Sequence, residues 1–378
     1  MRCAVSATKR RRDCASVSRR GRRVMVPAEW ASVSPPWLST PSEVNGATAR
    51  VLFTRTVRRR NFKGFPFWVS CPPETCSTVA QHAREYAGTV GFSRPVVLPD
   101  YGSESIGFFR EKQWLPERPV TFPGKRDFKL LFLGSDPAQH VLVGEVEHWT
   151  QIHVRPGLPE SVDIPATPGL MDRHGPFSHS PGYEFLTSNP SFAGSGLQVE
   201  CAIHIPALTA LRRLQPTQQA LNAMGVELHP LTVRVPGAAE AGFFRVLSRG
   251  GMKFPEDVLY EEFARKIQSL LATEIEAFDQ WRKQEQKRLE DRIFRSLRLL
   301  QEARTLDYTE YLTFDSFTRT GIYSGHFTSS LLPKLEELRV RSQPFHIAVT
   351  QGRPVSPETD VFRAELARSL LQSAGSGG

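Results

Sequence analysis

Short runs of apolar side chains, separated by Gly, Pro, Ser and Asp, recur through the first 250 residues of the chain. Runs of this length and spacing are typical of strands, and helical patterns interrupt them at residues 74–87 and, briefly, between residues 205 and 225. A hairpin turn is predicted at Ser135-Asp136-Pro137. The pattern therefore predicts strands at residues 50–56, 128–134, 140–144, 149–154, 197–205, 225–235 and 243–247.

The pattern changes near Pro255, where apolar residues begin to recur at the spacing of a helix. The residues that set this spacing are Phe263, Ile267, Leu270, Leu271, Ile275 and Phe278. Helical patterns then continue to the Ser- and Gly-rich end. Residues 156–190, rich in Pro, Gly, Ser and His, predict a long loop. We therefore expect a mixed α/β body followed by a helical C-terminal part, with no internal repeat.

Net charge is the most conspicuous property of the composition. The chain of 378 residues carries a formal charge of +9, but residues 1–24 alone hold nine Arg or Lys residues against Asp13. The basic character therefore belongs to a leader. We interpret this leader as disordered, or as an over-long start with Met25 the real beginning. The alternative is a basic arm that binds nucleic acid or anionic lipid.

The leader has no apolar core of a signal peptide, and no apolar run approaches the ~18 residues that span a bilayer. The five cysteines are too few and too scattered for a disulfide framework, and Cys71 and Cys76 have no second pair to form a metal site. These features predict a cytoplasmic protein without a membrane segment and without a bound structural metal.

Four segments carry residues suited to phosphate chemistry. Residues 51–67 read VLFTRTVRRRNFKGFPF, and guanidinium groups offer planar forks of donors to oxyanions. Residues 182–208 contain Gly194-Ser195-Gly196, where the backbone can approach a ligand closely. Residues 144–154 place two carboxylates and a histidine at a strand edge, and residues 233–248 form the fourth segment. Read singly, Arg58 to Arg60 is a solvated run, and His148 and His204 are hydrogen-bonded packing residues.

In this order, the four segments resemble motifs of the ATP:guanido phosphotransferases, the family of creatine kinase, arginine kinase and the bacterial protein-arginine kinases. The motif S-S-R-I-R-x-x-R-N-x-K-G-Y-P-F is matched from Phe53 to Phe67, N-E-E-D-H-L-R falls on residues 144–150, and the glycine-loop motif is echoed from Asn189 to Gln198. Residues 289–304 and 356–366 resemble the C-terminal domain of the bacterial enzymes, which are the best match.

The resemblance implies a fold and a division of the chain. The fold class is α+β, with a guanido-kinase-like antiparallel sheet packed by helices and a helical C-terminal domain that dimerises in the bacterial relatives. We expect a leader at residues 1–24, a proline-rich segment at 25–49, a catalytic-type domain at 50–278 and the helical domain at 279–378.

The resemblance also implies a nucleotide site at Thr54, Arg55, Gln198 and Arg234, using ATP and Mg²⁺ if the chain is active. Only part of the family's arginine clamp is present. Arg55 is kept, whereas Val57, Thr150 and Gln198 stand at arginine positions. Val146 stands at the catalytic glutamate position, which leaves Glu145 and Glu147 as candidates for the base. Phe192 occupies an asparagine position and fills space.

At the C-terminus, the family's phosphoarginine-recognition pattern R-D-x-x-R-A reads Thr359 to Ala364, so Asp360 and Arg363 are its candidate binding residues. A single charged contact in the transition state is worth about 10² to 10³ in rate. We therefore predict a weakly active or non-catalytic regulatory pseudokinase. Its partners would be a protein, an arginine-phosphorylated protein, a second copy or a paralogue. The alternative is an active protein-arginine kinase using Arg55, Arg234 and Glu145 or Glu147.

Overall fold

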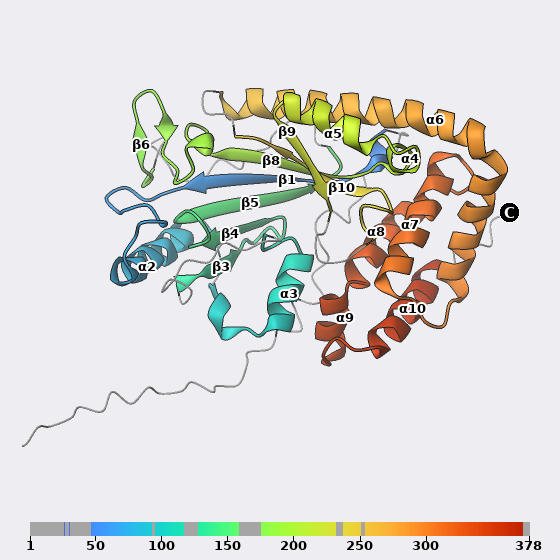
Figure 1. The fold of residues 1–378 in the computed structure, drawn as a ribbon. Coiled ribbons are helices and arrows are strands. Elements are labelled where there is room, and N and C mark those ends of the chain that lie inside the picture. The colour runs from blue at the N-terminus through green and yellow to red at the C-terminus, as the bar shows by residue number, and fades with distance from the viewer. Residues whose placement is uncertain are drawn as a thin grey trace, which may run out of the picture.

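An eight-stranded antiparallel sheet forms the body of the molecule, in the strand order β2-β3-β4-β5-β1-β8-β10-β9 (Figure 1). The computed structural model describes residues 26, 30, 47–92, 95–116, 128–158, 175–231, 237–250 and 254–372. The strands are β1 (Val51–Arg60), β2 (Val96–Val97), β3 (Leu130–Leu133), β4 (Gln139–Val143), β5 (Trp149–Pro156), β8 (Leu197–His204), β9 (Val226–Pro230) and β10 (Phe243–Ser248), with a separate hairpin of β6 (His179–Ser180) and β7 (Glu184–Phe185).

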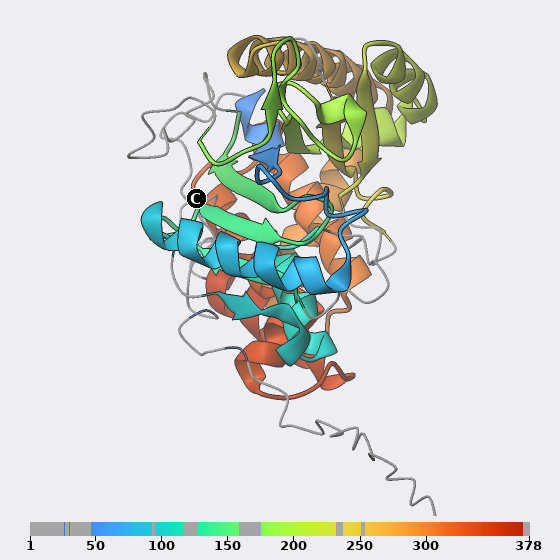
Figure 2. The same cartoon turned by 90° about the vertical axis from the view of Figure 1, so that its left-hand side faces the viewer.

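Helices cover both faces of this sheet and then form the C-terminal part (Figure 2). Within the described residues, no helix is long and apolar enough to cross a membrane. The helices are α2 (Pro73–Thr89), α3 (Ser103–Glu111), α4 (Pro206–Ala210), α5 (Leu214–Ala223), α6 (Glu256–Glu302), α7 (Tyr308–Tyr323), α8 (Leu331–Arg341), α9 (Pro344–Gln351) and α10 (Glu358–Leu371).

The two faces of the sheet bury different cores. On one face, Phe53, Val154 and Phe243 pack with side chains of α3 and of the C-terminal helices, such as Leu312 and Leu335. On the opposite face, residues of β8, β9 and β10 pack against α4, α5 and α6, while β3 and β4 pack against α2. The prediction of an antiparallel sheet packed by helices and followed by a helical C-terminal part is confirmed.

The predicted elements agree with the structure except in their extents. β1 continues four residues beyond its predicted end at residue 56, and the loop predicted at 156–190 contains the hairpin β6–β7 in its described part. The hairpin turn predicted at residues 135–137 lies between β3 and β4. The leader at 1–24, most of the segment 25–49, and Arg234 fall outside the described residues.

Helix α6 connects the sheet to the C-terminal helices. Its N-terminal half packs Phe263, Ile267 and Leu270 against the sheet, and its C-terminal half contributes Leu300 to the core shared with α7 and α8. The helix is interrupted at Glu285, whose φ of −128° and ψ of 31° are not helical. The predicted division between residues 278 and 279 therefore falls inside one helix, seven residues before this kink.

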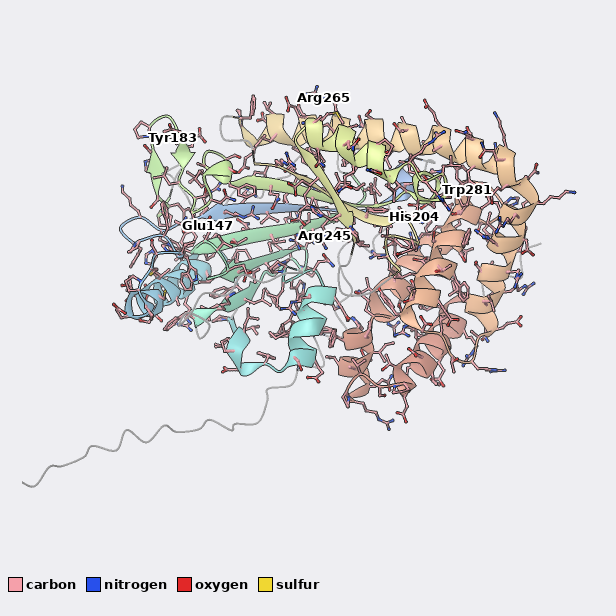
Figure 3. All side chains as sticks on the ribbon, viewed as in Figure 1. Glu147, Tyr183, His204, Arg245, Arg265 and Trp281 are labelled. Carbon is pink, nitrogen blue, oxygen red and sulfur yellow. The ribbon has the colours of Figure 1, made fainter. Side chains whose placement is uncertain are left out.

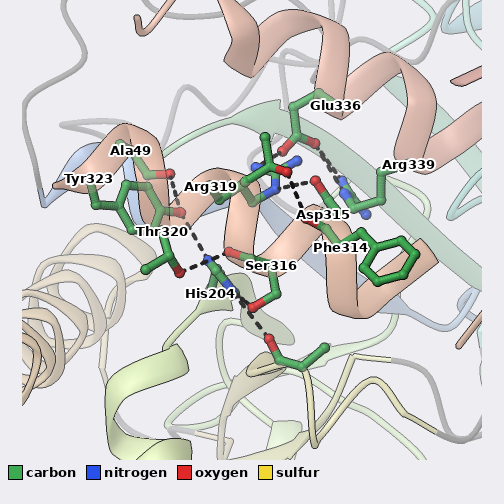
Figure 4. A network of polar contacts seen from close by, with 12 residues as sticks. Ala49, His204, Phe314, Asp315, Ser316, Arg319, Thr320, Tyr323, Glu336 and Arg339 are labelled. Atoms are coloured by element: carbon green, nitrogen blue, oxygen red, sulfur yellow. Dashed lines mark hydrogen bonds and ion pairs between the residues drawn. The ribbon is translucent and has the colours of Figure 1, made fainter. Parts of the chain in front are cut away.

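A buried polar network also joins the sheet to α7 (Figure 4). The Nε2 of His204, at the end of β8, donates to the carbonyl of Ala241 and lies 2.8 Å from the Oγ of Ser316 in α7. Its Nδ1 lies 3.1 Å from the hydroxyl of Tyr323. Burial lowers the pKa of His204 well below its ordinary value, so the ring stays neutral. The interpretation of His204 as a hydrogen-bonded packing residue is confirmed.

Candidate functional site: an arginine cluster on the sheet

Alternate residues of β1 point to the same side of the sheet, and three of them correspond to positions singled out in the sequence. Arg55, Val57 and Arg59 lie on one face of the sheet. The C-terminal helices cover this same face near the start of β1, at Phe53. Arg55 lies directly opposite Glu200 of β8. Its Nε is 3.1 Å from Oε2 of Glu200 and its Nη2 donates to Oε1 at 3.2 Å. Both side chains are buried, so Arg55 is neutralised within the fold.

A second arginine approaches the same carboxylate from β10. The Nη1 of Arg245 lies 3.6 Å from Oε2 of Glu200, and its Nη2 donates to Oε1 of Gln113 at 2.8 Å. Figure 3 shows Arg245 near the middle of the sheet. Burial opposes ionisation of Glu200, but Arg55, Arg245 and Arg59 outweigh it, and the pKa of Glu200 lies below its ordinary value. Glu200 is therefore a carboxylate, and we call these four residues the Glu200 cluster.

Arg59 lies at the edge of the Glu200 cluster and has its own partners. Its Nη2 donates to Oε1 of Gln198 at 2.7 Å, and its guanidinium lies 4.2 Å from the ring centroid of Phe192. Burial lowers the pKa of Arg59 to about 10, which the charge of Glu200 partly offsets. The space-filling role expected of Phe192 is thus a contact with an arginine, and Gln198 is engaged with protein rather than open to a nucleotide.

Thr54 does not belong to this face. It is the neighbour of Arg55 on β1 and so points to the opposite side of the sheet. Its hydroxyl donates to the carbonyl of Gly157 at 2.6 Å and lies 3.9 Å from the sulfur of Cys201. The structure therefore separates Thr54 from Arg55 and Gln198, with which the sequence had grouped it.

Both glutamates proposed as the base are held by other groups. Glu147 is fully buried and accepts hydrogen bonds from Nδ2 of Asn61 at 2.5 Å and from the amide and hydroxyl of Ser188 at 2.9 and 2.7 Å. Glu145 forms an ion pair of 2.8 Å with Lys129. Glu147 lies towards the end of the sheet away from the C-terminal helices, apart from Arg245 (Figure 3).

His148, next to Glu147, serves the fold as expected. Its Nδ1 accepts from the amide of Phe62 at 3.0 Å, and its Nε2 donates to the carbonyl of Pro66 at 2.8 Å. Burial lowers the pKa of His148 to about 4, so the ring is neutral at pH 7. Both ring nitrogens are used in positioning residues 62–66, which confirms the packing interpretation.

The interpretation of Arg58 to Arg60 as a solvated run is wrong for two of its members. Arg58 and Arg60 are 7% and 8% exposed, and both pair with Glu256 at the start of α6, at 2.9 and 3.3 Å. The guanidinium of Arg60 also lies 3.6 Å from the ring centroid of Phe185. Helix α6 covers this face of β1, and the sequence pattern of β1 alone does not indicate that contact.

Gly196 does allow close approach, but to protein. At Gly196, with φ of +66°, an added Cβ would lie 2.4 Å from Nη1 of Arg60 and 2.5 Å from the carbonyl oxygen of Arg59. Nη1 of Arg60 donates to the carbonyls of Arg59 and Ser195. The glycine loop is therefore fitted around β1.

In the C-terminal pattern, Arg363 is buried and bonded inside the fold. Its Nη1 donates to Oδ1 of Asp360 and to the carbonyl of Leu306, both at 2.6 Å, and its Nε donates to the carbonyl of Ser342 at 2.8 Å. The structure thus brings Asp360 and Arg363 together, as the sequence pairing anticipates, in a contact that joins α10 to the segments before α7 and after α8.

The described residues do not fit a nucleotide clamp. The charge of Arg55 is matched by Glu200, Thr54 lies on the other face, and Val57 and Thr150 offer no guanidinium. Among these residues there is also no group of three or more His, Cys, Asp or Glu side chains that could hold a metal ion. No step through ATP or Mg²⁺ can be built from this geometry.

Sequence reasoning missed Glu200 and Arg245, the residues that define the cluster. A signal was present, because each is the only Asp, Glu, Lys or Arg in a short, mostly apolar strand. Charged residues are seldom fully buried unless they are paired. Two such residues in separate strands therefore indicate a buried ion pair, although the pattern does not identify the partners.

Comparisons with known proteins agree with the motif resemblance. Residues 286–377 match the family model described as the protein-arginine kinase McsB C-terminal domain. The chain is 23% identical over 350 residues to a protein-arginine kinase of Shouchella clausii, covering 89% of this chain and 95% of that one. It is 26% identical over 356 residues to a protein-arginine kinase of Desulforamulus reducens, covering 90% and 98%.

Among solved structures, the duplicated taurocyamine kinase of Schistosoma mansoni matches with a TM-score of 0.46 at 15% identity, covering 67% of this chain and 36% of that chain. The family model begins one residue after the kink of α6 at Glu285. In agreement with the ordered motifs from Phe53 onward, the chain is thus similar to protein-arginine kinases along about nine-tenths of its length.

Proposed function

We propose that this chain is a guanido-kinase relative with little or no phosphoryl transfer, which acts as a regulatory protein through its contacts with another protein. The observation that carries the proposal is the buried ion pair of Arg55 with Glu200. Four positions of the family's arginine clamp can be compared among the described residues, and of these only Arg55 is an arginine. Its charge is already neutralised by Glu200. A phosphate reaching it would have to displace or neutralise a buried carboxylate.

The remaining chemistry points the same way. A phosphoryl group in transfer carries charge that several cations must stabilise, and each such contact is worth about 3–4 kcal/mol. Val57, Thr150 and Gln198 supply none of this charge. A base must also reach the guanidino nitrogen, whereas Glu147 is enclosed by Asn61 and Ser188. Such losses together remove many orders of magnitude in rate, even if they are not additive.

The regulatory role requires a partner, and we propose a second copy of the chain or a paralogue in contact with the C-terminal helices. The position of Arg363 does not favour phosphoarginine as the recognised group, because its donors serve Asp360, Leu306 and Ser342. Light scattering measures this association, first with the purified chain alone and then with the chain mixed with a paralogous protein. A monomer in both samples would contradict the proposed partner.

Calorimetric titration of the full chain with ATP·Mg²⁺ tests the loss of activity, together with an assay for phosphoarginine on a protein substrate. We expect no heat of binding up to millimolar nucleotide and no phosphoarginine. Micromolar binding that Arg55→Ala abolishes would overturn the proposal. Glu227→Gln is a matched control, because Glu227 pairs with Arg249 and His229 on the exposed edge strand β9.

The second candidate is an active protein-arginine kinase using Arg55, Arg234 and Glu145 or Glu147. The similarity to proteins of that name over about nine-tenths of the chain favours it. On this hypothesis, Glu147→Gln would abolish phosphoarginine formation while the variant stayed folded. On our proposal there is no activity for Glu147→Gln to remove.

A further inference from the structure

Glu200 stands among more positive than negative charge in the described part of the sheet. The Glu200 cluster brings three guanidinium groups to one carboxylate, and Arg55, Arg245 and Glu200 are each less than a tenth exposed. Guanidinium groups cannot shed their charge, so a buried group of them needs an anion. The side chain of Glu200 is an anion on which all three arginines act.

The carboxylate does not use all the donors around it. Nη1 of Arg55 and Nη1 of Arg59 are buried and have no hydrogen-bond partner among the described residues. A carboxylate has two oxygens in a plane, whereas a tetrahedral oxyanion presents acceptors in several directions. The cluster therefore has donors to spare for a tetrahedral anion, while the negative charge of Glu200 repels any second anion at short range.

We propose that Glu200 is an internal anion that keeps an oxyanion site occupied, and that neutralising it would open the Glu200 cluster to phosphate. The inference rests on the proposed function, because it supplies the reason that nucleotide phosphates are excluded from Arg55. The ligand class of the opened site is a tetrahedral oxyanion, either free phosphate or a phosphoryl group of a nucleotide.

The test uses Glu200→Gln in the full chain, which keeps the shape of the side chain and removes its charge. Thermal unfolding is measured in phosphate and in chloride at equal ionic strength. The variant should unfold at lower temperature than the wild type in chloride, because it leaves buried arginines without their counter-ion. Phosphate should recover much of this loss, since a ligand that binds only the folded state stabilises it.

Calorimetry then measures binding directly. We expect Glu200→Gln to bind inorganic phosphate at least about tenfold more tightly than the wild type, a difference of about 1.4 kcal/mol. ATP without metal is a second arm, and a gain for ATP that exceeds the gain for phosphate would identify a nucleotide rather than the free anion. Glu227→Gln, whose exposed pairs lie outside the cluster, should behave as the wild type.

Three results would overturn the inference. Glu200→Gln could unfold at the same temperature as the wild type, or its unfolding temperature could fall by the same amount in chloride and in phosphate. The third is equal affinity of the wild type and the variant for phosphate. If Glu200→Gln does not fold in either salt, Glu200→Gln combined with Arg245→Gln restores the net charge of the cluster and leaves Arg55 and Arg59 without the charge of Glu200. No phosphate-specific gain in that double variant would equally overturn it. ATP binding by the wild type would instead contradict the proposed function.

Discussion

Arg319 of α7 and Glu336 of α8 form an ion pair of 2.7 Å, and their side chains are 1% and 7% exposed. Asp315 and Arg339 complete this group, with distances of 3.0 Å to Arg319 and 2.7 Å to Glu336 (Figure 4). Each of these four buried side chains forms an ion pair with a side chain of opposite charge. The C-terminal helices are therefore held by a closed set of charges as well as by apolar packing.

Glu336→Gln should lower the free energy of unfolding by about 3 kcal/mol or more, because removing one partner leaves buried arginine charge uncompensated. Urea denaturation followed by circular dichroism measures the change. The neighbouring Glu337 pairs with Arg341 at 2.6 Å on the surface, so Glu337→Gln should cost less than about 1 kcal/mol. Equal costs for the two variants would disprove the importance of burial here.

A second buried carboxylate makes stability depend on pH. Glu274 of α6 accepts hydrogen bonds from the amides of Ala207 and Leu208, and burial raises its pKa from 4.5 to about 7. Between these values the folded state binds more protons than the unfolded state, so stability falls as pH rises. We expect wild type to lose on the order of 3 kcal/mol through this window relative to Glu274→Gln.

Chemical denaturation from pH 4 to pH 8 measures this difference. Glu276→Gln is the matched control, since Glu276 is exposed on the same helix. The control should follow the wild type throughout. Parallel pH profiles for wild type and Glu274→Gln would show that the carboxyl of Glu274 titrates alike in the folded and unfolded states.

Gly196→Ala tests the fit of the glycine loop around β1. The new methyl group would meet Arg60 and the backbone of Arg59 at a residue with φ of +66°, so both strain and overlap oppose it. We expect a loss of about 3 kcal/mol or more. Gly182 has φ of +92° with no atom near its Cβ position, and Gly182→Ala should cost about 1 kcal/mol. A smaller loss at Gly196 than at Gly182 would contradict the close approach.

Glu147→Ala tests the structural role of that carboxylate. It removes the acceptor for Asn61 and for the amide of Ser188, and buried donors left unsatisfied cost about 1–3 kcal/mol each. A loss of about 3 kcal/mol is expected by thermal or urea denaturation. Glu240→Ala, at an exposed glutamate, should stay within about 0.5 kcal/mol of wild type. A Glu147→Ala variant as stable as wild type would leave Glu147 available for chemistry.

The sequence predicted the elements better than it predicted their partners. Apolar runs and helical spacing are local properties, and so β8, β10 and the first half of α6 lie where the pattern places them. The Arg55–Glu200 pair depends on the register between β1 and β8, which no local pattern contains. Likewise, Arg58 and Arg60 are buried only because Glu256 at the start of α6 lies against β1.

The family positions give a different lesson. The motif resemblance found Arg55 and the substitutions at Val57, Thr150 and Gln198 from sequence alone. It could not indicate that Thr54 faces away from Arg55, or that Ser188 and Asn61 enclose Glu147. Motif matching identifies which residues remain at a site, and the contacts of those residues decide whether they remain available.

Helix α6 supplies buried residues to the cores on both sides of its kink at Glu285. Cutting the chain at that residue would separate the part of α6 that covers the sheet from the C-terminal helices, which we call the bundle. Both fragments would then expose apolar surface that is buried in the intact chain. The sheet and the bundle should therefore melt in a single cooperative transition, and neither should behave as an autonomous module. The kink is then a bend within one folding unit rather than a seam between two.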